Sequence, residues 1–489
     1  MFERVFNLQD QEAFARLSGD YNKLHLDAVA ARRYLSAGPV VHGMHMVLWA
    51  LDRWLQGDER PRQLISLKVS FIKSLGLGQA VTGAIVDDSQ EEVSLKLNSQ
   101  GQLLVSIRAV CKSLDALQPD HCAAACPMPR TCKSLGPDEV MNARGEVPLG
   151  VDKDAACRLF PNLLGRLPLV QVSEMLGLTR IVGMECPGLH SLLSGVDVVF
   201  GDVKEEVPVL KYQSAGFRRG VSLMTMAVEG ACVKGAITAF LRPAPARQMD
   251  FSSLRDIVGP DEFKGQHALI IGGSRGLGEI TAKLLAAGGA RVLLTYARGR
   301  EDAFRVVDEI NSLAGRAEAL CFDILDPGGT QAGRIADFSP THLYYFATPP
   351  MTANRGAFSS KLFNGFSDYY VTGFSQTLEF VMECSRGLTS VFYPSSDFID
   401  KQLLFFVEFV KAKIAGEVLC SILEKQKKGV VFYRPRLPKM ATDQTASIIA
   451  DHSRDPVPMM LEQLRRLEAM VPQNLEDKLY DQCTKSLRQ

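Results

Sequence analysis

The sequence predicts two α+β units with antiparallel sheets, followed by a Rossmann-type α/β unit with a doubly wound parallel sheet. In each of the first two stretches, an apolar helix-like run precedes four strand-like runs, which glycine and polar turns separate. From Phe263 the pattern changes to strand, glycine-rich turn, helix and strand, which is typical of a βαβ unit. At 489 residues the chain is too long for one hydrophobic core, so several domains are expected.

The first unit is expected at residues 1–118. Its predicted elements, in order, are a strand at 2–8, a helix that ends at Leu55, and strands at 63–72, 80–87, 92–97 and 103–112. Residues 119–150 are rich in proline, cysteine, glycine and charge, and we expect a linker there.

The second unit, residues 151–246, repeats this plan. An apolar helical stretch at 169–182 is followed by strand-like runs at 194–203, 211–217, 222–229 and 233–241. A second linker is expected at 247–262.

The third unit is expected at 263–446, and residues 447–489 are expected to form a C-terminal helical tail. Apolar residues recur in the tail at roughly helical spacing. We expect them to close the third unit or to form an interface; they are Met459, Met460, Leu461, Leu464, Leu467 and Met470.

Charge and composition exclude several classes of partner. Lys plus Arg and Asp plus Glu both number 55, so neither nucleic acid nor an anionic membrane is an expected partner. No apolar run of transmembrane length exists, and the N-terminus does not read as a signal peptide. Eleven cysteines without such a signal indicate reduced thiols and a cytoplasmic protein. Cys122, Cys126 and Cys132 lie close together without a histidine cluster, so no metal is expected.

The most informative stretch is residues 17–27, which read LSGDYNKLHLD. Asp20 precedes His25 by five residues, and a second segment, VVHGM at 40–44, opens the apolar helix. A carboxylate and an imidazole that face one small volume can move a proton off carbon and deliver one to a leaving oxygen. The N-terminal amides of a helix can polarise a thioester carbonyl. The pattern therefore indicates addition or removal of water across an acyl thioester.

These segments resemble the MaoC-like (R)-specific enoyl hydratase and 3-hydroxyacyl-thioester dehydratase family, in which LSGDxNPxHxD precedes HGM. The resemblance implies a hotdog fold, catalytic roles for Asp20 and His25, and a backbone N–H of Gly43 that binds the thioester oxygen. Lys23 stands where the family usually has proline, which removes no reactive group. A capped turn with a buried histidine is the simpler interpretation of a lone Asp or His, but the whole ordered pattern favours the catalytic one.

The second unit resembles the β-hydroxyacyl carrier-protein dehydratase pattern only in part. Leu159 stands at that family's histidine position, no glycine follows Pro168, and Glu174 is one residue too far along. We therefore expect a double hotdog in which the second half completes a substrate tunnel without a working site of its own. Glu174 is a candidate polar residue of the tunnel, and His190 is expected to be structural or to lie near the substrate.

The glycine-rich turn of the third unit reads GGSRGLG at 272–278, between a predicted strand and a predicted helix. Such a turn lets a pyrophosphate approach the backbone and the helix N-terminus. It resembles the short-chain dehydrogenase/reductase family motif (T/G)GxxxGxG. The resemblance implies cofactor contacts from Gly272, Ser274, Arg275, Gly276, Leu277 and Gly278.

The expected cofactor is NADP(H). No acid ends the second predicted strand, and Arg298 and Arg275 suit a 2′-phosphate better than a free ribose hydroxyl. Asp323 and Ile324 fit the family's adenine-contacting pair, and Lys413 fits its ribose-orienting lysine.

The reductase chemistry is where this resemblance breaks. The family uses Ser, then Tyr thirteen residues on, then Lys four further; here these positions are Ser396, Phe409 and Lys413. Phenylalanine cannot donate a proton, so carbonyl reduction should lose most of its general-acid assistance. The family's helix asparagine falls at Tyr370, and Tyr370 or Ser396 are the candidate substitutes. A divergent reductase and a purely nucleotide-binding or structural domain both stay open.

The first functional hypothesis is dehydration of (3R)-hydroxyacyl thioesters to trans-2-enoyl thioesters, or the reverse hydration, in fatty-acid or polyketide-type biosynthesis. Its partner would be a thioester on acyl carrier protein or coenzyme A, and a homo-oligomer is compatible with it. The alternatives are an NADPH-dependent 3-ketoacyl-thioester reductase that uses the hotdog units to grip the acyl chain, and a non-enzymatic scaffold for a carrier-protein assembly. Turnover of enoyl thioesters, turnover of ketoacyl thioesters, or binding without turnover would separate the three.

Overall fold

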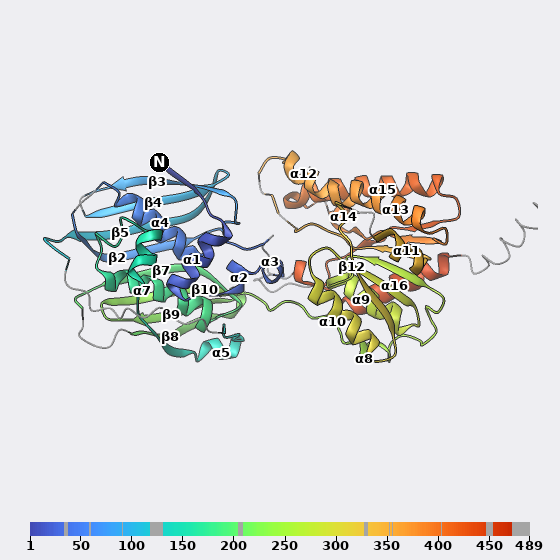
Figure 1. Ribbon diagram of the computed structural model, residues 1–489, viewed down its shortest axis with the longest axis horizontal. Helices are drawn as coiled ribbons and strands as arrows, with labels where there is room; N and C mark the ends of the chain where they lie inside the picture. Colours follow the sequence, from blue (N-terminus) through green and yellow to red (C-terminus); the bar gives the residue numbers. More distant parts are fainter. Residues whose placement is uncertain are drawn as a thin grey trace, which may run out of the picture. The chain divides into compact units, whose positions relative to one another are not determined.

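The computed structural model divides into two compact units, Met1–Pro245 and a second unit that begins at Ala246 and includes the C-terminal helix (Figure 1). The residues it describes are 1–33, 38–57, 60–89, 91–117, 131–203, 209–326, 331–351, 353–354, 356–401, 403–445 and 453–471. Cys122 and Cys126 lie outside this set. No helix among the described residues is long and apolar enough to cross a membrane.

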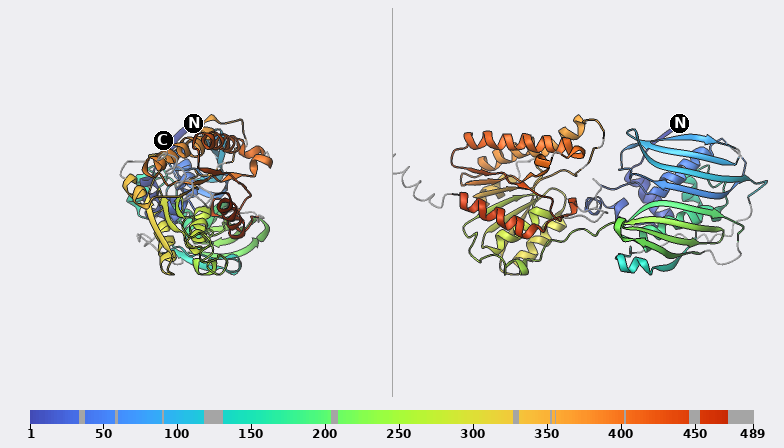
Figure 2. Two further views of the ribbon diagram at one scale, coloured as in Figure 1. Left: turned by 90° about the vertical axis from the view of Figure 1, so that its right-hand side faces the viewer. Right: turned by 180° about the vertical axis from the view of Figure 1, so that it is seen from behind.

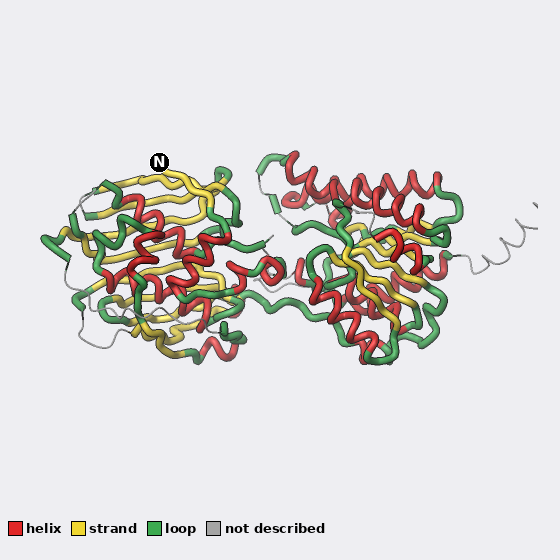
Figure 3. The backbone as a smooth tube through the Cα atoms, viewed as in Figure 1, coloured by secondary structure: helices red, strands yellow, loops and turns green. Residues whose placement is uncertain are grey.

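The first unit is a double hotdog, as the sequence predicts. One ten-stranded antiparallel sheet, in the order β1-β3-β4-β5-β2-β7-β10-β9-β8-β6, curls around two central helices (Figures 1 and 3). The order consists of two five-stranded halves, which meet where β2 pairs with β7 around Lys68 and Asp197. The central helices are α4 (Gly43–Trp54) and α7 (Leu169–Arg180).

The strands of the first half begin at the N-terminus and end before the expected linker. They are β1 (Phe2–Val5), β2 (Arg62–Phe71), β3 (Ala80–Asp88), β4 (Glu92–Ser99) and β5 (Gln102–Ser113). The strands of the second half are β6 (Arg144–Pro148), β7 (Ser191–Phe200), β8 (Val209–Arg218), β9 (Leu223–Glu229) and β10 (Val233–Leu241).

The apolar pattern of the sequence explains this wrapping. Alternate residues of β4, namely Val93, Leu95 and Leu97, are fully buried, whereas the residues between them are not. That period of two is typical of a strand with one face on a core. Helix α4 is buried along most of its circumference because the sheet curls around it.

Two buried polar side chains, one from each half, form hydrogen bonds with the other half. Asp52 of α4 accepts hydrogen bonds from the backbone N–H groups of Asn162 (2.7 Å) and Leu163 (3.0 Å) in the second half. Gln171 of α7 returns the contact, because its amide donates to the carbonyl of Leu64 and accepts from the Leu64 N–H, both at 2.9 Å. Leu64 lies at a register shift in β2, where the ladder leaves these groups unpaired.

The stretch 119–150 differs from the linker that composition predicts. Its described part carries α5 (Pro137–Met141) and β6, which pairs with β8 at the end of the sheet. The strand is short and mostly exposed, with only Val147 buried, so its period-two signal is too weak to read from sequence.

The second unit is a six-stranded parallel sheet with helices on both faces (Figures 1 and 2), as predicted. Its order is β13-β12-β11-β14-β15-β17. The strands are β11 (His267–Ile271), β12 (Arg291–Tyr296), β13 (Arg316–Cys321), β14 (His342–Tyr345), β15 (Ser390–Phe392) and β17 (Val431–Tyr433). The main helices are α9 (Gly276–Ala287), α10 (Arg300–Asn311), α11 (Ala332–Phe338), α12 (Ser360–Ser367), α13 (Gly373–Cys384), α15 (Val407–Gln426) and α16 (Pro456–Met470).

Alternate residues of each strand face two separate cores. Ala268 and Ile270 of β11 face a core that includes residues of α9, α10 and α16, whereas Leu269 and Ile271 face one that includes residues of α11, α13 and α15. Burial on both faces explains why these strands read as continuous apolar runs.

The expected linker at 247–262 belongs to the second unit. It forms α8 (Phe251–Leu254), and Phe251, Leu254 and Val258 are buried in the core beside α9. Their helical spacing was the sequence signal for this packing, but it spans too few residues to stand out. The tail helix α16 likewise packs against α9, with Met460, Leu464 and Leu467 buried there.

We predict that Asp52→Ala destabilises the first unit by about 2 kcal/mol, because it leaves the buried N–H of Leu163 and the partly buried N–H of Asn162 without their acceptor. Urea denaturation followed by tryptophan fluorescence measures this directly, since both tryptophans, Trp49 and Trp54, lie in α4.

The matched control is Asp197→Asn, which also breaks a contact between the halves. Its ion pair with Lys68 is 2.8 Å long, but both side chains are 65% exposed, so we expect a loss below about 0.5 kcal/mol. Equal losses in the two variants would show that burial of the Asp52 contacts is not what ties the halves together.

Candidate active site

The loop that carries Asp20 begins where α1 (Leu8–Ser18) ends. Gly19 stops the helix in the left-handed conformation, with φ of 75°, and its N–H donates to the carbonyl of Ala15. Glycine adopts this conformation without steric cost, so the LSGD segment is a helix stop as well as a motif. Asp20 follows at once, with a side chain that is 2% exposed.

Both halves of the unit supply partners of the Asp20 carboxylate, and the first-half partner is the N–H of Asn22, which donates to Oδ1 at 3.2 Å. The hydroxyl of Thr179, in α7, donates to Oδ2 at 2.8 Å. Gly183 leaves the space for the carboxylate, because a Cβ there would lie 2.0 Å from Oδ1. Gly183 is part of η1 (Ile181–Glu185), a π-helical turn that continues α7. Asp20 thus belongs to the first half of the unit, and its carboxylate lies against residues of the second half.

Asn22 fixes the same loop on both sides. Its Oδ1 accepts from the N–H of Leu24 and so begins the short helix α2 (Lys23–Leu26), while its Nδ2 donates to the carbonyls of Gly183 (3.0 Å) and Gly188 (3.1 Å). The bend after Asp20 is therefore held by side-chain hydrogen bonds, and Lys23 takes the place of the family's proline without loss of the turn.

His25 lies on α2 and faces Asp20. Its Nδ1 is 2.8 Å from the carbonyl oxygen of Val40, so Nδ1 must carry the hydrogen that bonds there. In the neutral ring the other nitrogen, Nε2, is then the basic one. One carboxylate oxygen of Asp20 and one ring nitrogen each of His25 and His42 lie within 4.8 Å of one another.

Burial brings the pKa values of Asp20 and His25 closer together. Burial raises the pKa of Asp20, although His25, the Thr179 hydroxyl and Arg180 act in the opposite direction. Burial also lowers the pKa of His25, against the attraction of Asp20. A smaller gap between the two pKa values eases proton transfer in either direction.

Gly43 is the first residue of α4, so its N–H has no partner within the helix. A Cβ at Gly43 would lie 2.8 Å from the ring of Phe71, at the end of β2. Glycine here therefore lets the Phe71 ring lie against the helix N-terminus, and the partial positive charge of that terminus lies beside the Asp20–His25 pair.

His42 is the N-cap residue of α4, and the sequence motif alone predicts no role for it. Its Nε2 is 3.0 Å from the carbonyl oxygen of Asp20, and its Nδ1 is 2.9 Å from Oε1 of Gln11. Both nitrogens are therefore engaged with protein oxygens. Because of these contacts we assign no metal ion to the Asp20, His25 and His42 cluster.

Sequence reasoning missed Thr179 and Gly183, which belong to no motif and lie about 160 residues from Asp20. It also considered Glu174 for the tunnel, and the structure gives Glu174 another task. The carboxylate accepts from the N–H groups of Cys232 (2.9 Å) and Val233 (3.2 Å), so it holds the turn between β9 and β10.

The glycine turn of the second unit has the geometry that phosphate binding needs. Gly272 is left-handed at φ of 79°, and a Cβ at Gly278 would lie 2.2 Å from the carbonyl oxygen of Gly272. The turn therefore packs tightly under the N-terminus of α9, whose N-cap residue, Arg275, makes no side-chain capping bond. Free N–H groups at this helix end form an anion site. Ser274, Gly276 and Leu277 lie in the same turn.

The predicted phosphate-binding cations are Arg275, which lies in this turn, and Arg298, which follows β12. The N–H of Gly272 donates to Oγ1 of Thr295 at 3.1 Å, which brings the end of β12 against the turn. Arg298, just beyond β12, is exposed, and Arg275 is partly buried with Asp443 3.9 Å away. Ile324 is buried in the core near Gly373, and Asp323 accepts from the N–H of Leu325.

Phe409 lies in an aromatic cluster. Its ring contacts those of Phe366 (5.7 Å), Tyr370 (5.7 Å) and Phe398 (6.1 Å), measured between ring centroids. Tyr370 is buried, and its hydroxyl is 2.6 Å from Oγ1 of Thr348. Ser396 is partly buried, and its Oγ accepts from the N–H of Phe398.

Lys413 is one turn along α15 from Phe409. Its ammonium donates to the carbonyl of Pro394 at 2.7 Å and lies 3.8 Å from the ring centroid of Tyr370. Burial lowers the pKa of Lys413 to about 7. The structure thus brings Lys413, Tyr370 and Phe409 together.

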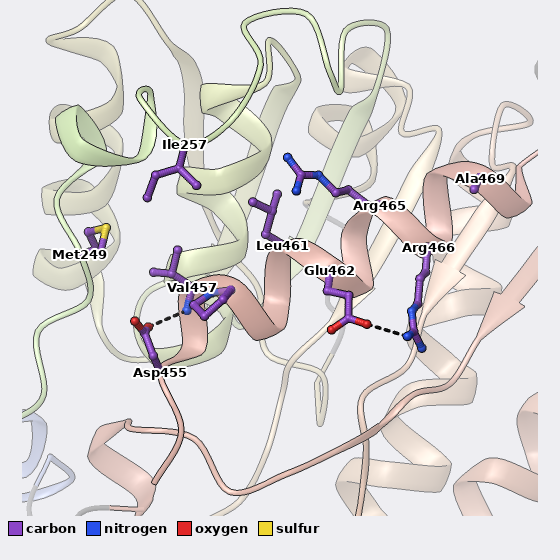
Figure 4. A pocket seen from close by; sticks show the side chains of 10 residues that line it. Met249, Ile257, Asp455, Val457, Leu461, Glu462, Arg465, Arg466 and Ala469 are labelled. Atoms are coloured by element: carbon purple, nitrogen blue, oxygen red, sulfur yellow. Dashed lines mark hydrogen bonds and ion pairs between the residues drawn. The ribbon is translucent and has the colours of Figure 1, made fainter.

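A groove on the second unit lies apart from these residues (Figure 4). Val457 and Leu461 of α16 line it together with Met249 and Ile257. Glu462 and Arg466 form an ion pair of 2.5 Å along the same helix. None of the predicted site residues lines this groove.

Two family models match parts of the chain. Residues 3–103 match the family described as MaoC like domain, and residues 266–333 match the family described as short chain dehydrogenase.

Individual relatives cover parts of the second unit. A versicolorin reductase of Emericella nidulans is 37% identical over 81 residues, which are 17% of this chain and 30% of that protein. An L-rhamnose 1-dehydrogenase (NADP(+)) of Thermoplasma acidophilum is 38% identical over 66 residues, or 14% of this chain and 26% of that protein. The chain thus spans less than a third of the length of these curated relatives. A solved short chain dehydrogenase from Burkholderia cenocepacia, in complex with NADP, is 20% identical, with coverage of 43% of this chain and 92% of that one and a TM-score of 0.38.

Proposed function

We propose that this chain, which joins a MaoC-like domain to a short-chain dehydrogenase domain, adds water to trans-2-enoyl thioesters and removes it from (3R)-hydroxyacyl thioesters. The observation that carries the proposal is the pair of buried Asp20 and partly buried His25, which lies beside the N-terminus of α4 in a site that both hotdog halves form. A carboxylate, an imidazole and a free helix N-terminus are the groups that this reaction needs.

In the hydration direction, the Asp20 carboxylate takes a proton from water as the water oxygen bonds to C3 of the enoyl group. His25 takes up a proton at Nε2 when the substrate is bound and gives this Nε2 proton to C2. Its Nδ1 stays bonded to Val40, so the ring keeps its orientation while Nε2 gains or loses the proton. The N–H of Gly43 stabilises the enolate-like thioester oxygen. Dehydration is the same path in reverse, with His25 as base and Asp20 as acid.

For the second unit we propose NADP(H) binding. The glycine turn and α9 would hold the pyrophosphate, Arg275 and Arg298 would hold the 2′-phosphate, and Lys413 would approach the ribose. The similarity to the Thermoplasma relative, an L-rhamnose 1-dehydrogenase (NADP(+)), supports this choice. Bound NADPH would supply a hydride for a carbonyl, and the residues around Phe409 offer poor proton donation to the resulting alkoxide.

The fusion supports a place in β-carbon processing of a fatty-acid or polyketide type, since ketone reduction yields the hydroxyl that dehydration removes. The acyl group would be presented on a carrier protein or coenzyme A. A second candidate, ketoacyl reduction as the main activity, is favoured by the intact glycine turn and disfavoured by Phe409. A carrier-protein scaffold would bind both thioesters and turn over neither.

We predict that Asp20→Asn and His25→Ala each lower the rate of crotonyl-thioester hydration by roughly a hundredfold or more, the scale of general acid–base catalysis. The rate is measured as the loss of enoyl absorbance, with mass spectrometry for the gain of water, on both coenzyme A and carrier-protein substrates. The control, Asp197→Asn, removes an exposed carboxylate of the same unit and should keep the wild-type rate.

Near wild-type turnover in folded Asp20→Asn and His25→Ala would place the chemistry elsewhere. Binding of both thioesters without turnover in the wild type would favour the scaffold.

We predict that Phe409→Tyr raises NADPH-dependent reduction of a 3-ketoacyl thioester, because it returns a hydroxyl beside Lys413. NADPH oxidation measures the rate. Calorimetry with NADPH and NADH shows whether both variants bind the cofactor, and we expect preference for NADPH. Robust reduction by the wild type would mean that Tyr370, Ser396 or water already donates the proton. No gain in the variant, with NADPH bound, would favour a structural domain.

A further inference from the structure

His42 touches all three parts of the proposed active site. Its ring lies 3.0 Å from the backbone carbonyl of Asp20 and stacks on His25, with ring centroids 3.7 Å apart and planes at 24°. It also immediately precedes Gly43, as the N-cap residue of α4. The ring is fully buried. Its hydrogen-bond state therefore affects the position of both Asp20 and His25.

Both ring nitrogens of His42 face oxygens that can only accept. The partner of Nε2 is the carbonyl oxygen of Asp20, which has no hydrogen to give. The partner of Nδ1 is a side-chain oxygen of Gln11, at 2.9 Å. The same Gln11 oxygen is 3.0 Å from the backbone N–H of His42, which must donate, so this end of the amide is its oxygen.

The other end of Gln11 agrees with this orientation. Its Nε2 is 3.3 Å from Nδ1 of His45, one turn further along α4, so the amide donates and His45 accepts. Neutral His45 then carries its hydrogen on Nε2, which lies buried with no hydrogen-bond partner among the described residues. The reversed amide would instead set its NH2 group against the backbone N–H of His42.

A neutral His42 has one hydrogen too few for its two hydrogen-bond partners. A neutral imidazole has one N–H, and His42 has two acceptors to satisfy. Either neutral form leaves a nitrogen lone pair against an oxygen lone pair in a buried site, where such a contact is costly. One additional proton on His42 satisfies both contacts at once.

The charged groups around the ring act in opposite directions. Burial, His25 and His45 disfavour a charge on His42 and hold its pKa well below its usual range, although the hydrogen bond to the Asp20 carbonyl acts in the opposite direction. The carboxylate of Asp20 lies within 4.8 Å of a His42 ring nitrogen and compensates a positive charge while it is ionised. Arg180 acts on Asp20 from α7.

We propose that His42 is a positioning residue of this site and works in its doubly protonated form, with one N–H donated to the Asp20 carbonyl and the other to Gln11. Together with the Asp20 carboxylate it makes the resting site electrically neutral. His25 is then neutral in the resting enzyme, because two stacked imidazolium rings 3.7 Å apart would repel strongly. The consequence for turnover rests on the proposed function; the protonation state does not.

The direct test is nitrogen NMR of the wild-type protein at pH 7, without substrate. The chain has eight histidines, so selective ¹⁵N-histidine labelling gives few signals, and His42→Phe assigns the one of interest. We expect two similar ring shifts with a hydrogen on each nitrogen for His42, and two well separated shifts for His45. A single N–H on His42 at pH 7 would overturn the proposal.

Variants of the network supply a matched comparison. Gln11→Met removes the acceptor of Nδ1, so His42 should revert to the neutral form with its hydrogen on Nε2. A His42 that stays doubly protonated there would contradict the role of Gln11. If this variant fails to fold, the wild-type spectrum still decides.

Kinetics then test the positioning role. His42→Phe should lower hydration by about tenfold or more and shift the pH profile, because the anchor of Asp20 is lost. His45→Phe alters the other histidine that bonds Gln11 but touches neither Asp20 nor His25, and it should change the rate less than about threefold. Equal losses of hydration rate in His42→Phe and His45→Phe would show that the effect of His42 is merely structural. No hydration by the wild type, with His42 doubly protonated, would reject the proposed function and leave the assignment of the proton intact.

Discussion

The buried carboxylate of Asp20 is the constraint on which the first unit depends. It comes from the first hotdog half, but the Thr179 hydroxyl and the space at Gly183 come from the second. A carboxylate with no exposed surface needs hydrogen bonds and nearby positive charge to stay ionised. Both halves contribute them, the first through the Asn22 N–H and His25 and the second through Thr179 and Arg180, and the two halves share one sheet and one core.

This division explains how the second half can lack a catalytic pair of its own. Glu174 holds a turn between strands there, and α7 with its π-helical extension forms the wall behind Asp20. In the second unit, the glycine turn follows the reductase pattern more closely than the residues around Lys413 do. This glycine turn packs tightly under the N-terminus of α9, while the aromatic rings of Phe409 and Tyr370 lie around Lys413.

Local patterns made much of this predictable. The double hotdog, the parallel sheet and the closeness of Asp20 to His25 follow from motifs and periodicity within short windows. Thr179 and Gly183 could not be predicted, because their contact with Asp20 depends on packing between residues about 160 positions apart. The exposed strand β6 was missed for another reason, since one buried residue gives no alternation to detect.

The measurement that tests this account most directly is the pH dependence of hydration in Thr179→Val. The folded enzyme needs Asp20 ionised, and the Thr179 hydroxyl lowers the pKa of that carboxyl. Loss of the hydroxyl should therefore raise this pKa and move the acid limb of the profile upward by about one pH unit, whereas Thr179→Ser should leave it in place. An acid limb that does not move in the valine variant would contradict the claim that a residue of the second half controls the pKa of Asp20 in the first.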